Sequence, residues 1–202
     1  MSRIRNYLVK PTQLTSNVTV WGVTLLEVMT TISIISILST LVLSNMENFI
    51  VKLRVDNEIS KIKRLLLLTR NAAVHNQSKA VLCPLNKTGQ CSTDWHKELS
   101  VFVDNNNNRM FDANSNETIL RTKVAIKDKD KLLYGKRRKS ITYNPAGHLS
   151  GLSNGTFRYC PYNHEEKSRG IVIARSGRVY STSDTDNDMK DETRMNKEIT
   201  CD

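Results

Sequence analysis

The feature that most constrains this chain is an uncharged apolar run between two glutamates near its N-terminus. Between Glu27 and Glu47 lie 19 residues rich in Ile, Leu, Val and Met, diluted mainly by Ser and Thr. A helix rises about 1.5 Å per residue, so a run of this length approaches the roughly 30 Å hydrocarbon core of a bilayer. The run therefore predicts a single membrane-spanning helix.

The residues ahead of the run predict its orientation. Arg3, Arg5 and Lys10 are the charged residues there, and none is acidic. The positive-inside rule then keeps the N-terminus cytoplasmic and exports everything that follows the helix. A cleaved secretory signal is the alternative, because it has the same basic start. The run is long for a signal core, however, and it ends in Asn-Met-Glu at 45–47 rather than in a small-residue cleavage site.

The junction between the leader and the run resembles the class III signal of type IV pilins and type II secretion pseudopilins. It reads Gly-Val-Thr-Leu-Leu-Glu over Gly22–Glu27. The resemblance implies that a prepilin peptidase cuts after Gly22, that the new N-terminus at Val23 is methylated, and that the apolar helix stays in the mature protein. Val23 stands where the family usually has Phe.

Glu27 needs a partner, because a carboxylate near the bilayer interior costs roughly 2.5 to 3.5 kcal/mol on insertion scales. The resemblance implies that it pairs with the N-terminal amine of a neighbouring subunit and sets the register of helices in a filament. The alternative is a glutamate in the first turn of a helix, stabilised by the helix dipole and reaching the headgroups.

The helix is expected to continue beyond the apolar run. No Gly or Pro occurs from Glu47 to Gln77, so one helix over 25–77 would be about 80 Å long. Apolar residues recur there at mostly helical spacings and predict one buried face. They are Phe49, Leu53, Ile59, Ile62, Leu66 and Ala73, and the leucines at 65–68 are also expected in the core.

After Ser78 the sequence changes to short apolar segments separated by turn residues, which predict strands. These are Ala80–Cys83, Ser100–Val103, Thr118–Arg121, Ser140–Tyr143, Gly155–Tyr159 and Gly170–Ala174. A helix followed by consecutive strands predicts an α+β head, with an antiparallel β-sheet packed on the amphipathic half of the helix. The expected organisation is a leader at 1–22, a membrane or filament-core half-helix at 23–46, and a globular head at 47–202.

Several of these segments, in this order, resemble the GspH/FimT family of minor pilins. They are Val81–Pro84 with Cys91 and Trp95, Val101–Asp104, Glu117–Arg121, Gly155–Phe157 with Cys160, Ile171–Ile173, and Gly177–Arg178. The resemblance implies a type IV pilin fold and partners that include other pilins, the prepilin peptidase and the inner-membrane assembly machinery. It also implies a single-pass inner-membrane protein with a periplasmic head that later enters a filament. The Cys-Pro, second Cys and Trp pattern is closer to the FimT and FimU branch than to secretion pseudopilins.

Four cysteines, Cys83, Cys91, Cys160 and Cys201, all fall on the side predicted to be exported. An even count in an oxidising compartment indicates two disulfides, for which three pairings exist. Cys83 with Cys91 is favoured because a short polar loop separates them. Cys160 with Cys201 is favoured because the polar tail after Ser181 needs an anchor. Zinc is the alternative, but the cysteine and histidine spacings do not match zinc-ligand pairs.

Other chemistry is weakly represented. The Asn-rich segment after Asp104 places oxygens at calcium-loop positions, but Arg109 stands where an EF-hand needs Gly, so an ordinary turn is favoured. The four histidines form no pattern of base and nucleophile, and no Gly-rich phosphate loop occurs. We therefore expect no enzyme, no cofactor and no metal site.

The formal charge of +10 favours acidic partners. Basic residues cluster at Lys127, Lys129, Lys131, Lys136, Arg137, Arg138 and Lys139, and Tyr134 lies among them. Such a patch could bind DNA phosphates with Tyr134 stacked on a base, although a solvated loop is the simpler interpretation. Some FimT proteins take up DNA through a Gly-Arg-x-Arg motif. Here Gly177 and Arg178 match it, Tyr180 replaces the second Arg, and Arg175 is nearby.

Three hypotheses follow. The first is a minor pilin of a type IV pilus that primes or enters the filament through Glu27 and the apolar helix. The second is a pilin that also binds DNA, through Lys136, Arg137, Arg138, Lys139, Arg175 and Arg178. The third is a type II secretion pseudopilin.

Overall fold

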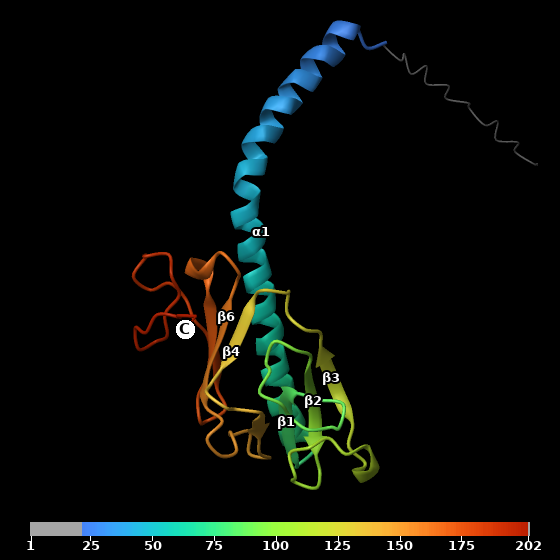
Figure 1. Cartoon of the computed structure of the whole chain (residues 1–202), viewed down its shortest axis with the longest axis vertical. Coiled ribbons are helices and arrows are strands. Elements are labelled where there is room, and N and C mark those ends of the chain that lie inside the picture. Colours follow the sequence, from blue (N-terminus) through green and yellow to red (C-terminus); the bar gives the residue numbers. More distant parts are fainter. Residues whose placement is uncertain (1–21, 202) are drawn as a thin grey trace, which may run out of the picture. The chain divides into compact units, whose positions relative to one another are not determined.

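The computed structural model describes residues 22–201, except for the side chains of residues 41–45. The predicted leader, apart from Gly22, therefore lies outside the described residues. Two compact units make up the chain, one ending at Ser44 and the other, the head, beginning at Asn45. The helix α1 (Leu25–His75) contributes to both units (Figure 1).

Within the head, α1 buries a stripe of residues spaced three or four apart. This stripe consists of Val51, Val55, Ile59, Ile62, Leu66, Thr69 and Ala73. The prediction was wrong for Phe49 and Leu53, which are more than half exposed, because the buried stripe passes through Val51 and Val55 instead. Leu67 is also exposed, since the four leucines at 65–68 extend around more than one face of the helix. The helix ends at His75, two residues earlier than expected, and Gln77 adopts a left-handed φ of 51°.

The strands form two antiparallel four-stranded sheets where the sequence predicted one. The first sheet has the order β3 (Ile119–Lys123), β2 (Leu99–Asp104), β1 (Lys79–Pro84), β5 (Ile141–Tyr143). The second has the order β4 (Lys131–Tyr134), β6 (Gly155–Cys160), β7 (Arg169–Ile173), β8 (Val179–Ser181). Short 3-10 turns, η1 (Ala113–Ser115) and η2 (Glu165–Lys167), lie in the connections. The predicted α+β class with antiparallel strands is confirmed, with the sheet divided in two.

Two of the eight strands, β4 and β8, were not predicted. β4 lies inside the basic segment expected to be a loop, yet it alternates between outward Lys131 and inward Leu132 and Tyr134. This period of two is the signature of a strand with one buried face. The strand was not predicted because the surrounding lysines raise the average polarity of the segment.

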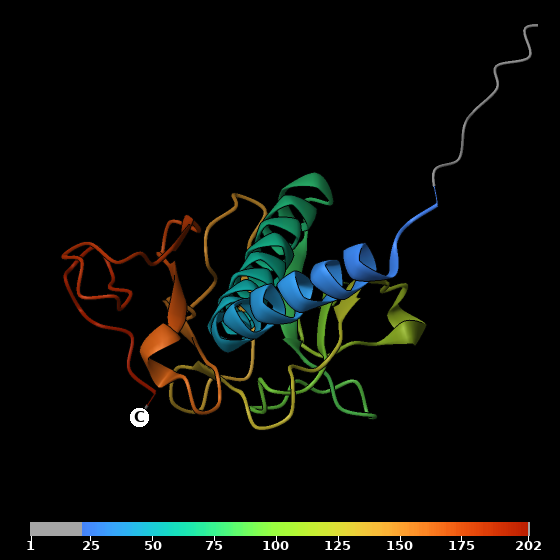
Figure 2. The ribbon, with the colours of Figure 1, turned by 90° about the horizontal axis from the view of Figure 1, so that it is seen from above.

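The head part of α1 lies against the sheets (Figures 1 and 2). The larger hydrophobic cluster contains residues of this part of α1 and of both sheets. Trp95 packs edge-on against Tyr134 and Phe157, with ring centroids 5.2 and 5.1 Å away, and donates its indole N–H to the Arg138 carbonyl at 2.8 Å. Tyr134 stacks on Phe157 at 4.2 Å. Trp95 therefore connects the second sheet to the loop that follows β4.

A buried carboxylate also links the helix to the second sheet. Asp130 accepts hydrogen bonds from the Tyr159 hydroxyl at 2.5 Å and the Tyr162 backbone N–H at 2.8 Å. Arg54 Nε of α1 lies 3.3 Å from the same carboxylate. Burial, reinforced by Asp130, raises the pKa of Tyr159 far above its ordinary value, so Tyr159 remains the donor. Asp130 therefore has a structural role in connecting α1 to β6.

Candidate functional site

The start of α1 is a capped helix terminus. Thr24 precedes the helix, and its Oγ1 accepts a hydrogen bond from the Glu27 backbone N–H at 3.2 Å. This arrangement is the N-cap half of a capping box, in which Ser or Thr is followed three residues later by Glu. Gly22, Val23 and Glu27 are exposed. Glu27 thus occupies the first turn, where the helix dipole favours a carboxylate.

The first unit presents an apolar surface on every side of the helix. Its large exposed hydrophobic residues are Val23, Leu25, Leu26, Val28, Met29, Ile32, Ile34, Ile35, Ile37 and Leu38. The hydroxyl groups between them bond to carbonyls of the same helix, as Ser33 does to Met29 and Ser36 to Ile32, both at 2.8 Å. Since these donors are satisfied internally, the surface suits apolar surroundings.

Across the described residues, no helix combines the length and the apolar character needed to cross a bilayer. The prediction of a membrane span over residues 23–46 therefore rests on the sequence.

The basic segment is divided by β4 into two groups. Lys127, Lys129 and Lys131 lie where β4 begins, and Lys136 to Lys139 follow its end. Tyr134 pairs with Phe157 in β6, and Gly155 pairs with Ile173, where β7 ends. The turn after β4 and the turn between β7 and β8 therefore lie at the same end of the second sheet.

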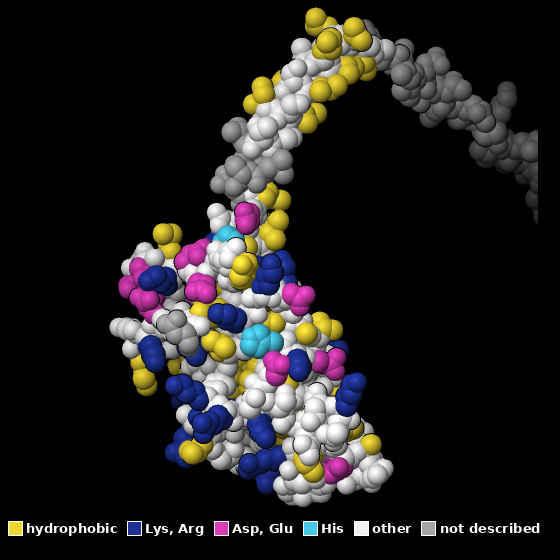
Figure 3. Space-filling model, in the orientation of Figure 1, with side chains coloured by type: hydrophobic (Ala, Val, Ile, Leu, Met, Phe, Trp, Pro, Cys, Tyr) yellow, Lys and Arg dark blue, Asp and Glu magenta, His cyan; other side chains and the backbone are white. Residues whose placement is uncertain are grey.

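This common end brings two sets of predicted DNA-binding residues together. We define the basic end as Lys136, Arg137, Arg138, Lys139, Arg175 and Arg178. Figure 3 shows Lys and Arg side chains gathered over the lower part of the head in that view. All members are exposed except Arg138, which is partly buried and donates to the Asn154 carbonyl. The basic end therefore offers five solvent-facing cations and one that also stabilises a loop.

Tyr134 cannot take part in such a surface as the sequence suggested. It is 2% exposed within the aromatic cluster, and its hydroxyl donates to the Ser153 carbonyl. Burial raises its pKa to about 12. The prediction that Tyr134 stacks on an exposed base is wrong because the side chain points into the core.

Both favoured disulfides are present. Cys83 bonds to Cys91, with Cα atoms 5.5 Å apart, and Cys160 bonds to Cys201, with Cα atoms 6.0 Å apart. The second bond ties the end of the chain to β6 across 41 positions of sequence. No described cysteine is left free.

The Asn-rich segment after β2 forms a closed turn. The side-chain amides of Asn106 and Asn108 donate to Asp112 Oδ2 at 2.9 and 2.6 Å. The buried Glu117 accepts from the backbone N–H groups of Asn105 and Asp112 at 3.0 and 2.9 Å. These bonds fit the interpretation of the segment as an ordinary turn.

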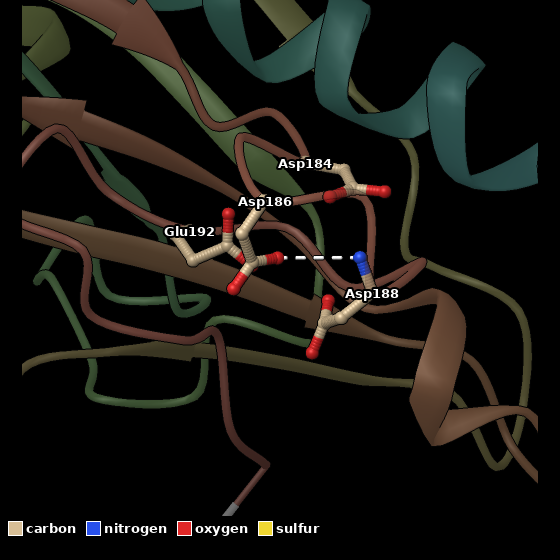
Figure 4. Close-up of side chains that lie close together, drawn as sticks. All are labelled: Asp184, Asp186, Asp188 and Glu192. Atoms are coloured by element: carbon tan, nitrogen blue, oxygen red, sulfur yellow. Dashed lines mark hydrogen bonds between the residues drawn. The ribbon is translucent and has the colours of Figure 1, made fainter.

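One cluster that was not predicted lies in the polar tail after Ser181. Asp184, Asp186, Asp188 and Glu192 each place a carboxylate oxygen within 4.8 Å of the others (Figure 4). The signal was available, because three aspartates occur at every second position and a glutamate follows four residues later. We refer to these four residues as the acidic cluster.

The chain is similar to known proteins both in sequence and in fold. Residues 58–177 match the family model described as "Type II transport protein GspH". The fold is similar to that of the type IV minor pilin FimU of Pseudomonas aeruginosa, with a TM-score of 0.51 at 17% identity over 67% of this chain and 90% of that one. The minor pseudopilin EpsH of Vibrio cholerae aligns with a TM-score of 0.44 at 12% identity, over 64% and 97% of the two chains. No curated protein matches the sequence.

Proposed function

Because this chain belongs to the GspH family of minor pilins and pseudopilins, whose members are structural proteins of type IV pili or type II secretion, we propose that it is a minor pilin of a type IV pilus. A prepilin peptidase removes residues 1–22, and the processed protein resides in the inner membrane with its head in the periplasm before assembly. The assembly machinery then moves it into a filament with other pilins.

The observation that carries this proposal is the exposed apolar surface of the first unit, which begins at a capped terminus with a carboxylate. A monomeric soluble protein rarely exposes so large an apolar surface. The surface suits lipid before assembly and the helices of neighbouring pilins after it. The accessible Gly22 and Val23 suit a peptidase that cuts between them.

Cleavage would create the partner that Glu27 needs. The new amine at Val23 is positive, and Glu27 of an adjacent subunit is negative. In apolar surroundings such a pair attracts far more strongly than in water. An unmatched Glu27 would remain a costly charge, so the pair would select the axial register at which subunits join.

Substitution of Glu27 tests this role. We expect Glu27→Ala and Glu27→Gln to reduce the amount of the protein in sheared filaments at least about tenfold, the equivalent of about 1.4 kcal/mol. Glu47→Gln is the matched control, since Glu47 is an exposed glutamate of the same helix. Normal incorporation of both Glu27 variants would refute the pairing. Mass spectrometry of the filament protein should show loss of 22 residues and a methyl group on Val23.

Gene deletion separates a pilus role from a secretion role. Loss of surface pili with normal export of secreted proteins would support the minor pilin. Loss of protein secretion with normal piliation would instead make the chain a secretion pseudopilin.

DNA binding by the basic end is a second candidate function. Its support is that the two turns carrying the predicted residues lie at one end of the second sheet. Phosphate contacts by several cations would give binding that is independent of sequence and falls steeply with salt. We expect the full chain in detergent to shift DNA at low salt and to release it as salt rises.

The division of the basic segment by β4 provides a matched control. Charge reversal at Lys136 and Arg137 should weaken DNA binding and reduce the salt slope by about two, whereas reversal at Lys129 and Lys131, at the opposite end, should change both less. Arg138 is unsuitable for this test because it also holds the Asn154 loop. Absence of binding at low salt would leave only the structural role.

A further inference from the structure

We propose that the acidic cluster is a calcium site formed by the tail loop of the head. The site shares no residue with the exposed apolar surface of the first unit or with the basic end, and it does not depend on the function proposed above. It also departs from the expectation, drawn from the sequence, that the chain has no metal ligands.

The four carboxylates converge from a single loop of nine residues. One oxygen from each of Asp184, Asp186, Asp188 and Glu192 lies within 4.8 Å of all the others, a separation that one ion at the centre can bridge. Figure 4 shows the Asp186 and Glu192 carboxylates side by side, with Asp184 and Asp188 nearby. Four negative charges at this distance repel one another unless a cation lies among them.

Glu192 provides an independent reason to expect a ligand. Glu192 is only 5% exposed, and its Oε1 is buried without a hydrogen-bond partner among the described residues. Oε2 is satisfied, because it accepts from the Thr185 backbone N–H at 2.9 Å and from its hydroxyl at 2.8 Å. A buried carboxylate oxygen without a donor is costly. A cation held by the cluster would remove that cost.

The neighbouring cations do not neutralise the cluster. Lys190 Nζ lies 3.8 Å from Asp188, but its closer contact is with Glu198 at 3.2 Å. Arg169 pairs with Asp191 and Asp56. Within the described part of the chain, no ion pair involves Asp184, Asp186 or Glu192. Most of the negative charge therefore remains available to a metal.

The donor set selects the kind of ion. Carboxylate oxygens are hard ligands, which calcium and magnesium prefer and zinc does not require. The aspartates occupy positions 1, 3 and 5 of the loop and Glu192 position 9. Backbone N–H groups inside the loop already fold it around these side chains, as Asn187 and Met189 donate to Asp184 at 2.7 and 3.0 Å. Such an irregular set suits the flexible coordination of calcium better than the strict octahedron of magnesium.

Calcium would stabilise the segment that connects β8 to the terminal disulfide. This segment is held by the pairing of Ser183 with Glu192, by the Ile199 N–H bond to Asp191 and by the Cys160–Cys201 bond. Asp184 and Met189 also line a groove of about 630 Å³ together with Phe49 of α1. Occupancy of the site would therefore fix one wall of a groove on the head.

Calorimetric titration of the metal-free full chain in detergent tests the proposal. We expect one calcium ion to bind per chain with a dissociation constant between about 10⁻⁴ and 10⁻³ M, the range of extracellular calcium modules. Asp186→Asn and Glu192→Gln should each weaken binding at least about tenfold. Asp128→Asn is the control, because Asp128 is exposed and the change in charge is the same; it should alter affinity less than about twofold.

Three outcomes would overturn the proposal. They are no saturation by 10 mM calcium, equal affinity for magnesium, and equal effects of Asp186→Asn and Asp128→Asn. Should the variants fail to fold, the unaltered chain remains informative. Calcium should then raise its midpoint of chemical denaturation, while the same concentration of magnesium leaves it unchanged. Equal effects of the two ions in that experiment would also refute a calcium site.

Discussion

Lys123 Nζ lies 2.6 Å from Glu58 Oε2, and both side chains are largely excluded from solvent. Glu58 belongs to the head part of α1 and Lys123 to β3, the edge strand of the first sheet. Lys61, one turn along the helix, contacts the other Glu58 oxygen at 2.8 Å. The ion pair thus joins the helix to a strand that buries only one of its five residues.

Removal of the lysine should destabilise the head strongly. Lys123→Met leaves Glu58 buried with one remaining, partly exposed partner, and breaking a buried pair in this way costs about 3 kcal/mol. Chemical denaturation followed by tryptophan fluorescence measures the loss. Lys61→Met should cost less than about 1 kcal/mol because Lys61 is partly exposed to solvent. The double variant Lys123→Met, Glu58→Leu should recover most of the stability, and a failure to recover it would refute the pairing argument.

Acid should weaken the native protein through the same carboxylate. Burial by itself would raise the pKa of Glu58, but the contacts with Lys123 and Lys61 outweigh it, and the pKa lies below the ordinary value of 4.5. A carboxyl whose folded pKa is lowered contributes stability above its unfolded pKa and loses it as pH falls through the folded pKa. The denaturation midpoint should therefore fall as pH drops below 4.5, and fall less in Lys123→Met. Equal acid sensitivity of the two proteins would contradict this assignment.

Short-range sequence patterns were enough to predict the helix, most strands and the disulfides. The buried positions of α1 from Ile59 onward recur at helical spacing, and six strands alternate or run apolar between turn residues. The two disulfides were predicted from a short loop and from a tail with almost no apolar residues. In each case a few neighbouring residues carry enough information to favour one structure.

Other features required contacts that no local pattern contains. Tyr134 lies among lysines in sequence, and only the packing of Trp95 and Phe157 shows that it belongs to the core. The acidic cluster depends on the fold of the tail, in which Glu192 is buried by its pairing with Ser183 and Glu198. The division of the basic segment into two ends follows from the pairing of β4 with β6, which is a tertiary relationship.

Gly177 is required in the turn between β7 and β8, which carries Arg175 and Arg178. Its φ is +77°, and a Cβ there would lie 2.1 Å from the Gly147 carbonyl oxygen and 3.1 Å from the Tyr143 ring. Gly177→Ala should cost about 1 to 2 kcal/mol from the left-handed backbone and about 1 to 3 kcal/mol more from displacement of the neighbouring chain. Gly151→Ala is the matched control, because its φ is +72° and a Cβ there meets nothing within 4 Å. Equal destabilisation in thermal denaturation would show that backbone strain, and not the close contact, requires the glycine.

The two disulfides should differ in what they stabilise. Cys160 and Cys201 are separated by 41 positions, whereas Cys83 and Cys91 are separated by 8. Closing the longer loop restricts the unfolded chain more. Replacing Cys160 and Cys201 by serine should therefore cost about 4 kcal/mol, and replacing Cys83 and Cys91 about 2.5 kcal/mol.

Loss of the Cys160–Cys201 bond also frees the tail, which Ile199 anchors beside Gly170. Limited proteolysis should then cleave first between residues 183 and 199 in the Cys160→Ser, Cys201→Ser variant. The Cys83→Ser, Cys91→Ser variant controls for the loss of a disulfide as such, and equal protease sensitivity of the tail in both would show that the terminal bond does not anchor it.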